Sequence, residues 1–236
     1  YVTDGVSDHC LEALNSFNIC YEFIKPLVFE HQNYIFDRFK HNWTKLRLFE
    51  QEGFSRLVYL DADMCVLKNM DELFELVLEE DGIAMSPACT CNPEKKDLYP
   101  EHWKPENCFF YQPKETFYGN AGLLVLEPKK YLLKNMLSSL EAIDVSKYLF
   151  VDQDFLNTYF CGKITVLSYV YNTLKTCLLR HKDVCRLEDV KAIHYILDKP
   201  WEERKNPVDT IYKEINDIWK QVYKKRMVLT ESVKIS

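Results

Sequence analysis

Two aspartates one residue apart, Asp61 and Asp63, are the residues of this sequence best placed to do chemistry. They follow residues 56–60 (RLVYL), an apolar run that predicts a buried strand. Side chains at positions i and i+2 of an extended chain point the same way, so the two carboxylates would project together while Ala62 turns away. Like charges held that close are costly unless a cation lies between them. Oxygen donors suit Mg²⁺ or Mn²⁺, so the sequence predicts a metal that could bind a diphosphate.

An Asp-x-Asp pair also has an ordinary interpretation. It occurs by chance in many loops, where it forms a turn or caps a helix. The position of this pair after a buried strand favours ligand binding, because ligands of open α/β sheets bind at the carboxyl ends of the strands.

Three further patches place polar side chains at expected strand ends or helix starts. They are Asn120 in a small-residue turn, the stretch 152–154 (DQD), and the pair His194 and Lys199. Each has a structural alternative. Asn120 could hold a turn, Asp152 could cap a helix, and His194 could be a hydrogen-bonded core histidine. Lys199, which precedes a proline, could be a surface lysine.

The elements that must position these residues follow from apolar periodicity and from turn and cap signals. Helices are predicted at 8–18, 69–80, 129–143, 155–160 and 210–224, an amphipathic segment at 42–53, and strands at 20–28, 56–67, 82–85, 117–128, 163–167 and 191–196. Because strands alternate with helices, the predicted class is α/β with a mixed, mostly parallel central sheet flanked by helices.

One long segment, residues 86–114, fits no helix or strand. It carries five prolines and three cysteines and has little periodicity. Connections of this length are usually functional or disordered. Its tyrosines and tryptophan favour an ordered lid over disorder.

The composition restricts the class of protein. The chain has 236 residues, of which 47% are apolar, and a net charge of −6. This length fits one large domain or one domain with appendages. The sequence lacks a Lys/Arg run long enough to follow a phosphate backbone, which argues against nucleic acid as a partner. No apolar run approaches the roughly 20 residues that span a bilayer. The first residue is Tyr1, so we expect further residues upstream.

The nine cysteines are spread through the chain rather than clustered as a disulfide scaffold. Cys89 and Cys91 together with Cys108 could form a zinc site, but their spacing is not the usual Cys-x₂-Cys pair. The sequence alone therefore favours reduced thiols in a cytosolic enzyme.

Five separated motifs occur in a characteristic order. They are residues 56–67, 117–128, 152–157 (DQDFLN), 169–176 (YVYNTLKT) and 194–201 (HYILDKPW). In combination they resemble glycosyltransferase family 8, with the strongest likeness to its galactinol synthase and glycogenin branch. The resemblance covers residues 1–201 and predicts a GT-A domain there, N-terminally incomplete, followed by a helical tail over 202–236.

The resemblance implies a GT-A type nucleotide-diphospho-sugar transferase fold and a UDP-hexose donor that reacts with retention of configuration. It also implies Asp61, Asp63 and His194 as metal ligands. Two carboxylates and one imidazole suit Mn²⁺ better than Mg²⁺, although Mg²⁺ stays an alternative.

The resemblance further implies a set of donor-site residues. Lys199 would bind the diphosphate, where a fixed cation stabilises the charge that builds on departing UDP. Asp152 and Gln153 would hydrogen-bond the sugar hydroxyls; whether Asp152 is a transient nucleophile or only stabilises a front-face transition state stays open. The full implied set is Lys45, Asp61, Ala62, Asp63, Asn120, Ala121, Gly122, Asp152, Gln153, His194 and Lys199, with Asp152, Gln153 and Lys199 as catalytic residues.

Two features depart from the family pattern. The first strand of the family, which supplies uracil and ribose contacts, has no counterpart here. In glycogenin-like proteins a glycine follows the metal-binding histidine, whereas Leu197 and Asp198 occur here.

The predicted function is transfer of a hexose to a small polyol or sugar hydroxyl by a cytoplasmic enzyme without a membrane span, which could form a homodimer. Segment 86–114 would wall the acceptor pocket, with Tyr99, Trp103, Phe109, Phe110 and Tyr111 available to stack on a ring. The alternatives are a glycogenin-like glucosyltransferase acting on a protein or glycan, a haloacid dehalogenase-like phosphatase that attacks phosphate with its first aspartate, and an inactive scaffold that retains the fold. Met64 and Cys65 do not fit the small turn that the phosphatase motif needs.

Overall fold

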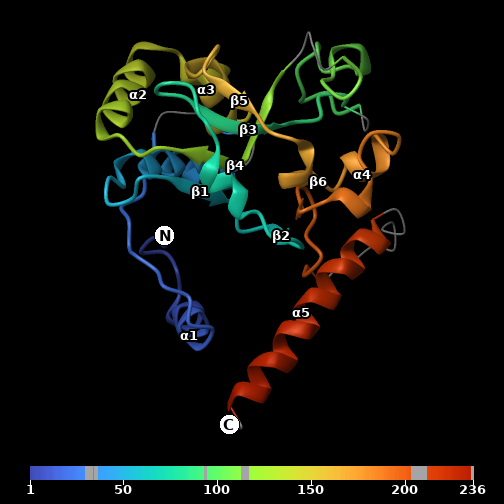
Figure 1. Ribbon diagram of the computed structural model, residues 1–236. Coiled ribbons are helices and arrows are strands. Elements are labelled where there is room, and N and C mark those ends of the chain that lie inside the picture. Colours follow the sequence, from blue (N-terminus) through green and yellow to red (C-terminus); the bar gives the residue numbers. More distant parts are fainter. Residues whose placement is uncertain (30–33, 35–36, 93–94, 113–116, 203–211, 235–236) are drawn as a thin grey trace.

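The computed structural model describes residues 1–29, 34, 37–92, 95–112, 117–202 and 212–234 (Figure 1). The helices and strands are α1 (Asp8–Ser16), β1 (Leu57–Leu60), β2 (Met64–Val66), β3 (Ile83–Pro87), β4 (Gly119–Leu126), α2 (Lys130–Ala142), α3 (Asp152–Tyr159), β5 (Ile164–Val166), β6 (Thr173–Leu174), α4 (Cys177–Arg180), β7 (Ala192–His194) and α5 (Lys213–Lys234). The amphipathic segment predicted at 42–53 is a 3₁₀ helix, Asp37–Glu50, and the acidic helix predicted at 69–80 is a shorter 3₁₀ turn, Asp71–Glu75.

The strands form two sheets. The four-stranded sheet has the order β1-β4-β3-β5, and the three-stranded sheet has the order β2-β7-β6. A mixed sheet was expected, but the expected majority of parallel pairs is wrong for the described strands, because β4 is antiparallel to both β1 and β3, and β2 is antiparallel to β7. Parallel neighbours need a crossover connection, usually a helix. In the four-stranded sheet, β5 follows α2 and α3 and pairs in parallel with β3.

Strand β4 is the centre of the larger sheet. It lies between β1 and β3, and residues Leu123–Leu126 are buried. A strand covered on both faces needs a continuous apolar run, which is what LLVL supplies. The N-terminal half of β4 differs from this apolar run. Its residues Gly119–Gly122 are small, apart from the polar Asn120, and lie at the candidate site described below.

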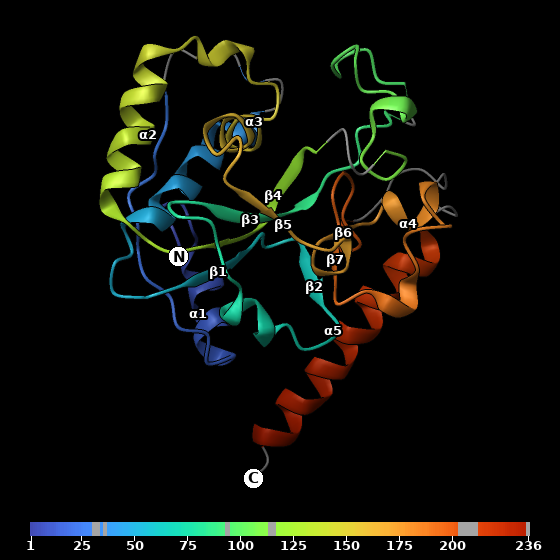
Figure 2. The same cartoon turned by 45° about the horizontal axis from the view of Figure 1, so that its top comes forward.

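Helices α2 and α3 pack beside the 3₁₀ helix on one side of this sheet (Figure 2). Their apolar faces share one core with the strands. The largest fully buried side chains of this core are Trp43, Phe49, Phe155 and Phe160. Rings of Trp43 and Phe155 meet edge to face with their centroids 5.9 Å apart, a geometry that adds to area burial.

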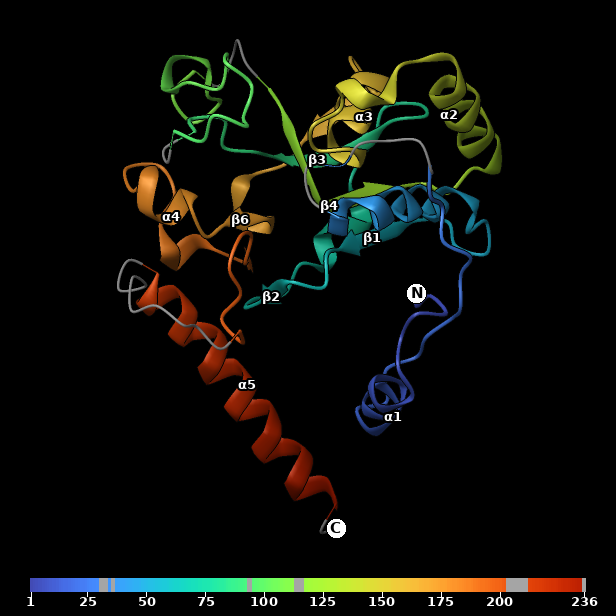
Figure 3. The ribbon, with the colours of Figure 1, turned by 180° about the vertical axis from the view of Figure 1, so that it is seen from behind.

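A second core joins the smaller sheet to α4 and to the start of α5. Tyr195 follows β7, is fully buried and donates a hydrogen bond from its hydroxyl to the Ile215 carbonyl at 2.8 Å. The rest of α5 extends away from the sheets, as Figures 1 and 3 both show. None of the helices in the described ranges has the length and apolarity that crossing a membrane requires.

The segment predicted as one strand over 56–67 is two strands. β1 belongs to the larger sheet and β2 to the smaller, and residues 61–63 form the turn between them. A hydrogen bond from Met64 N to the Asp61 carbonyl closes this turn at 3.1 Å. The strand predicted at 20–28 is also wrong, because the described residues there form only one isolated bridge, between Val2 and Phe23.

Candidate active site

The two aspartates lie where the chain passes from one sheet to the other. Asp61 N donates to the carbonyl of Gly122 on β4 at 2.7 Å, and Tyr195 N, just after β7, donates to the carbonyl of Asp63 at 2.9 Å. The turn is therefore attached to both sheets. The turn places both aspartates on the lining of one cavity.

His194 meets this pair because of strand register. It ends β7, directly opposite Met64 of β2, and Met64 immediately follows Asp63. The Nε2 atom of His194 lies 3.0 Å from Asp63 Oδ1 and 3.8 Å from Asp61 Oδ2. His194 is 3% exposed, so its ring is not a surface group that could easily turn away. The structure thus brings together the three predicted metal ligands.

A chain of amide groups determines which nitrogen of His194 carries the proton. The backbone N–H of Gly122 donates to Asn120 Oδ1 at 3.0 Å, which fixes that atom as an acceptor. Asn120 Oδ1 also accepts from Asn172 Nδ2 at 2.8 Å, so Asn172 Oδ1 faces His194 Nδ1 at 2.9 Å. His194 Nδ1 must then be a donor, so in the neutral ring the Nε2 atom offers its lone pair to a cation held by the two carboxylates.

Gly122 is needed for the position of the histidine ring. A Cβ atom built on Gly122 would lie 2.3 Å from His194 Cε1, 2.5 Å from His194 Nδ1 and 2.8 Å from Asn120 Oδ1. Gly122 lines the main cavity and is also the packing partner of the imidazole. The pairing of β3 with β4 is irregular beside Gly122. The register jumps between Met85 and Ser86, so residues 121–123 have no partner on β3. Such bulges are frequent beside active sites.

Lys45 neutralises two carboxylates from inside the protein. Its Nζ atom lies 3.1 Å from Asp61 Oδ1 and 2.8 Å from Asp152 Oδ2, and it donates to the Ala121 carbonyl at 2.8 Å. Burial alone would lower the pKa of Lys45, but Asp152 and Asp61 hold that pKa above its ordinary value. Burial raises the pKa of Asp152, and Lys45 opposes the increase.

Asp152 and Gln153 begin helix α3 and are bound to the wall of the site. Asn42 Nδ2 donates to Asp152 Oδ1 at 3.1 Å. Gln153 Oε1 accepts from Asn120 Nδ2 at 2.8 Å and from Ala121 N at 3.2 Å. Gln153 therefore holds the start of β4, Asp152 is held by Asn42 and Lys45, and both residues line the cavity.

Lys199 lies on the other side of the aspartate pair. Its Nζ atom forms an ion pair with Asp63 Oδ2 and donates to the Tyr195 carbonyl at 2.8 Å. Burial alone would raise the pKa of Asp63, but His194 and Lys199 hold that pKa below its ordinary value. The site thus combines three carboxylates with two lysines and a lone pair of an imidazole.

A cavity of about 440 Å³ opens in front of these residues. Of the five aromatic residues predicted to wall an acceptor pocket, Tyr99 and Trp103 line this cavity, together with Phe150. The Trp103 and Phe150 rings are stacked at 4.9 Å. The other three predicted aromatics do not line this cavity: Phe109 meets the Phe117 ring, and Phe110 and Tyr111 meet the His181 ring. Ala62 lines a second cavity, of about 430 Å³, that shares Lys45, Asp61 and Asp63 with the first.

Two residues beside the site have a left-handed backbone. Val151, just before Asp152, has φ 48°, and Leu197, close to Lys199, has φ 62°. For residues other than glycine this conformation costs about 1–3 kcal/mol, and such strain collects at functional sites. Leu197 therefore has a backbone conformation that glycine adopts without this cost.

Sequence reasoning missed two residues of this network, Asn172 and Asn42. Asn172 is 1% exposed and lies within the motif 169–176, but it precedes a strand of two residues that has no periodic signal. Asn42 reaches Asp152 across 110 positions of sequence.

The donor set fits a divalent ion. One ligand atom each from Asp61, Asp63 and His194 lie within 4.8 Å of one another. Two carboxylates that converge with an imidazole nitrogen form a donor set that a divalent cation between them stabilises.

Solved structures share this architecture. An active-site mutant of LgtC superposes with a TM-score of 0.63 at 19% identity, covering 89% of this chain and 80% of that one. The apo form of GlyE from Streptococcus pneumoniae TIGR4 superposes with a TM-score of 0.53 at 20% identity, covering 87% of this chain and 49% of that one. These superpositions show that the chain has the GT-A fold.

Residues 3–205 match the family described as glycosyl transferase family 8. The chain is 34% identical to galactinol synthase 1 of Solanum lycopersicum over 169 residues, which is 68% of this chain and 49% of that protein. It is 33% identical to galactinol synthase 4 of Arabidopsis thaliana over 202 residues, which is 77% of this chain and 58% of that protein. The chain belongs to glycosyltransferase family 8, which confirms the resemblance of the motifs, and it spans about half the length of the relatives that it matches.

Proposed function

We propose that the protein is a metal-dependent, retaining hexosyltransferase that moves a hexose from a UDP-sugar to a small polyol or sugar. The observation that supports this most is the convergence of Asp61, Asp63 and His194 beside Lys199 at one cavity. The galactinol synthases among the relatives indicate myo-inositol as the first acceptor to test and galactose as the first hexose.

In this proposal Asp61, Asp63 and His194 hold Mn²⁺, which offsets the negative charge of the donor diphosphate when it is bound. Lys199 adds a second positive charge near Asp63 and would face the leaving phosphate. The bond between the anomeric carbon and the phosphate oxygen breaks, and UDP leaves with both electrons of that bond. The oxygen of the acceptor hydroxyl bonds to the anomeric carbon, and the proton of that hydroxyl is released.

Asp152 and Gln153 would orient the hexose through its hydroxyls. Because Asp152 already accepts from Asn42 and Lys45, we assign it to stabilise a front-face transition state rather than to attack the sugar. The aromatic wall formed by Tyr99, Trp103 and Phe150 would exclude water and pack on the acceptor face. A cavity of about 440 Å³ favours a small acceptor over a protein or glycan chain.

The function is tested by measuring UDP release from UDP-galactose and UDP-glucose, with and without myo-inositol, in Mn²⁺, Mg²⁺ or EDTA. We expect release that depends on both the acceptor and the ion. Asp63→Ala should lower the rate roughly 10²- to 10³-fold, because it removes a ligand and the partner of Lys199. The exposed Asp71→Ala is the matched control and should behave as wild type.

Binding separates this proposal from the scaffold alternative. Mn²⁺ with UDP should raise the melting temperature, as any ligand specific for the folded state does, and Asp63→Ala should lose that shift. A shift without UDP release from any donor would favour an inactive scaffold. The absence of both a shift and release would refute the proposal.

Asn172 offers a second prediction, about the tautomer of His194. Asn172→Leu keeps the volume but removes the acceptor of His194 Nδ1, so the apparent Mn²⁺ affinity should fall about 10- to 100-fold. The rate at saturating Mn²⁺ should change much less. The control is Asn135→Leu, on the exposed face of α2. An unchanged Mn²⁺ titration would show that the amide chain does not orient the histidine.

A further inference from the structure

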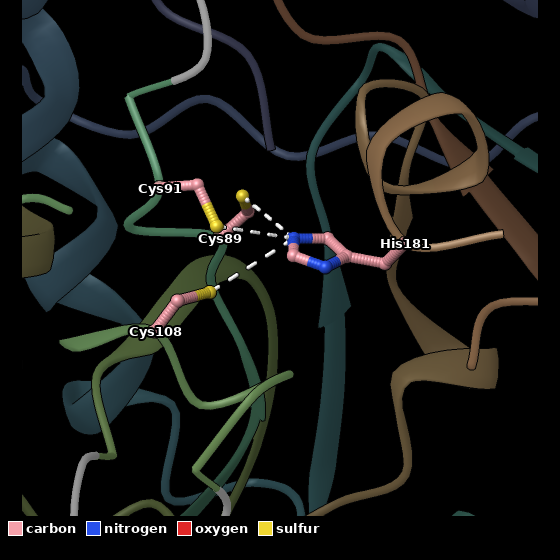
Figure 4. Close-up of side chains that lie close together, drawn as sticks. All are labelled: Cys89, Cys91, Cys108 and His181. Atoms are coloured by element: carbon pink, nitrogen blue, oxygen red, sulfur yellow. Dashed lines mark hydrogen bonds between the residues drawn. The ribbon is translucent and has the colours of Figure 1, made fainter. Parts of the chain in front are cut away.

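A second group of metal-ligand side chains lies outside the aspartate site. Cys89, Cys91 and Cys108 come from the long segment between β3 and β4, and His181 follows helix α4. Figure 4 shows the three sulfur atoms directed towards His181 Nε2. The sulfurs lie 3.1, 3.4 and 3.9 Å from that nitrogen, in chain order.

These distances have the size of the edges of a zinc tetrahedron. With Zn–S of about 2.3 Å and Zn–N of about 2.0–2.1 Å, a tetrahedral site has S···N edges of about 3.5 Å and S···S edges of about 3.8 Å. All four ligand atoms lie within 4.8 Å of one another. A hydrogen-bonded thiol cluster has no reason to surround one imidazole nitrogen with three sulfurs, because Nε2 can take part in only one good hydrogen bond.

Burial favours a bound ion over loose thiols. Cys91, Cys108 and His181 are 8%, 0% and 4% exposed, and Cys89 is partly buried. The Phe110 ring stacks on the His181 ring at 4.6 Å, and Tyr111 meets it edge to face at 5.0 Å. An apolar shell of this kind around soft donors resembles the surroundings of structural zinc sites, where solvent access is limited.

We propose that Cys89, Cys91, Cys108 and His181 form a structural Cys₃His zinc site. It is distinct from the aspartate site in ligand chemistry, since thiolates and imidazole select zinc whereas carboxylates suit harder ions. All four positions of the tetrahedron are protein ligands, which is the arrangement of structural rather than catalytic zinc.

The ion would fasten the long segment to the smaller sheet. In Figures 1 and 3 this segment lies beside α4. Within the segment, Thr90 Oγ1 donates to the Asn107 carbonyl at 3.1 Å. This bond holds the part of the segment that carries Cys89 and Cys91 to the part that carries Cys108. His181 N donates to the Cys177 carbonyl at 2.8 Å, so the imidazole is anchored to α4. Because Tyr99 and Trp103 of this segment line the main cavity, the zinc would stabilise the wall of that cavity.

The sequence spacing concealed the site. Cys89 and Cys91 are separated by one residue rather than two, and His181 comes 73 positions after Cys108. The fourth ligand was therefore visible only after folding. Two competing states have to be distinguished, namely a cluster of reduced buried thiols and a disulfide within the cluster.

Metal content is the first test. Protein purified without added metal should contain about one zinc ion per chain. This zinc should remain after dialysis against EDTA at a concentration that removes Mn²⁺. Reaction of the thiols with an organomercurial should release this zinc. Replacement by Co²⁺ should give thiolate charge-transfer and tetrahedral d–d bands. A wild-type protein without zinc that also fails to bind Co²⁺ under reducing conditions would overturn the proposal, as would a disulfide between any two of these cysteines in the freshly purified protein.

Variants test the ligand set. Cys108→Ser and His181→Ala should each reduce zinc to below about a fifth of the wild-type content and increase proteolytic cleavage within residues 88–112. Cys161→Ser removes an exposed thiol elsewhere and should retain zinc, as should Asp63→Ala. Cys177 lies beside Cys89 but is not assigned as a ligand, so Cys177→Ser should also retain zinc. Loss of zinc in Cys177→Ser together with full retention in Cys108→Ser would overturn the assignment.

Discussion

Replacement of Gly122 by alanine is expected to lower metal-dependent activity strongly. The new methyl group would lie 2.3 Å from His194 Cε1 and 2.5 Å from His194 Nδ1, well inside van der Waals contact. Neither side can yield easily, because the Gly122 carbonyl is bonded to Asp61 N and the imidazole is bonded to Asn172. We expect the new methyl group to displace the His194 ring and to weaken Mn²⁺ binding. The value of kcat/KM should then fall roughly 10²- to 10³-fold.

The measurement is Mn²⁺-dependent UDP release together with the thermal shift caused by Mn²⁺ and UDP. The protein chain offers a matched control in Gly53→Ala, since a Cβ atom there meets nothing within 4 Å. Overpacking of this kind costs about 1–3 kcal/mol, so Gly122→Ala should fold with a lowered melting temperature. A folded Gly122→Ala protein with wild-type Mn²⁺ affinity would refute the placement of His194.

Of the variants proposed for the aspartate site, Lys45→Met is expected to lose the most unfolding free energy. Lys45 lies between Asp61 and Asp152, and its side chain is 8% exposed. Among the described residues, its removal leaves the Asn42 side chain as the donor to the buried Asp152 carboxylate. Breaking a buried ion pair by removing one partner costs about 3–5 kcal/mol of unfolding free energy.

The loss should depend on pH. Burial raises the pKa of Asp152 above its unfolded value of 3.8, and Lys45 opposes this increase, so Lys45→Met should raise the pKa further. The native state then binds the proton more tightly than the unfolded state, and stability falls as pH rises through the folded pKa. The deficit relative to wild type should therefore be larger at about pH 8 than at about pH 5.

Denaturant unfolding of Lys45→Met at the two pH values measures this effect. Lys134→Met, on the exposed face of α2, controls for the loss of a lysine. Adding Asp152→Asn to Lys45→Met should recover part of the stability and remove most of the pH dependence, since no carboxylate then titrates there. A pH-independent deficit in Lys45→Met would mean that lost packing, not the unpaired carboxylate, causes the destabilisation.

Local chemistry made several elements predictable from the sequence. Ser7 caps α1 and its side chain accepts from Cys10 N, as the turn-and-cap signal indicated. The apolar runs of β3 and β4 and the periodic helix α2 lie close to their predicted positions. The resemblance of the motifs to family 8 also implied Asp61, Asp63 and His194 as metal ligands without any knowledge of the fold, and the fold brings these three side chains together.

Only the tertiary structure decided how those residues meet. Whether residues 56–67 form one strand or two depends on backbone partners far away in sequence, Gly122 and Tyr195, and periodicity carries no information about such partners. The same is true of the amide chain through Asn172 and of the thiols that converge on His181. The sequence by itself determined the donor atoms, since these follow from residue identity; the fold determined their geometry, since distances between remote residues are set by strand pairing and packing.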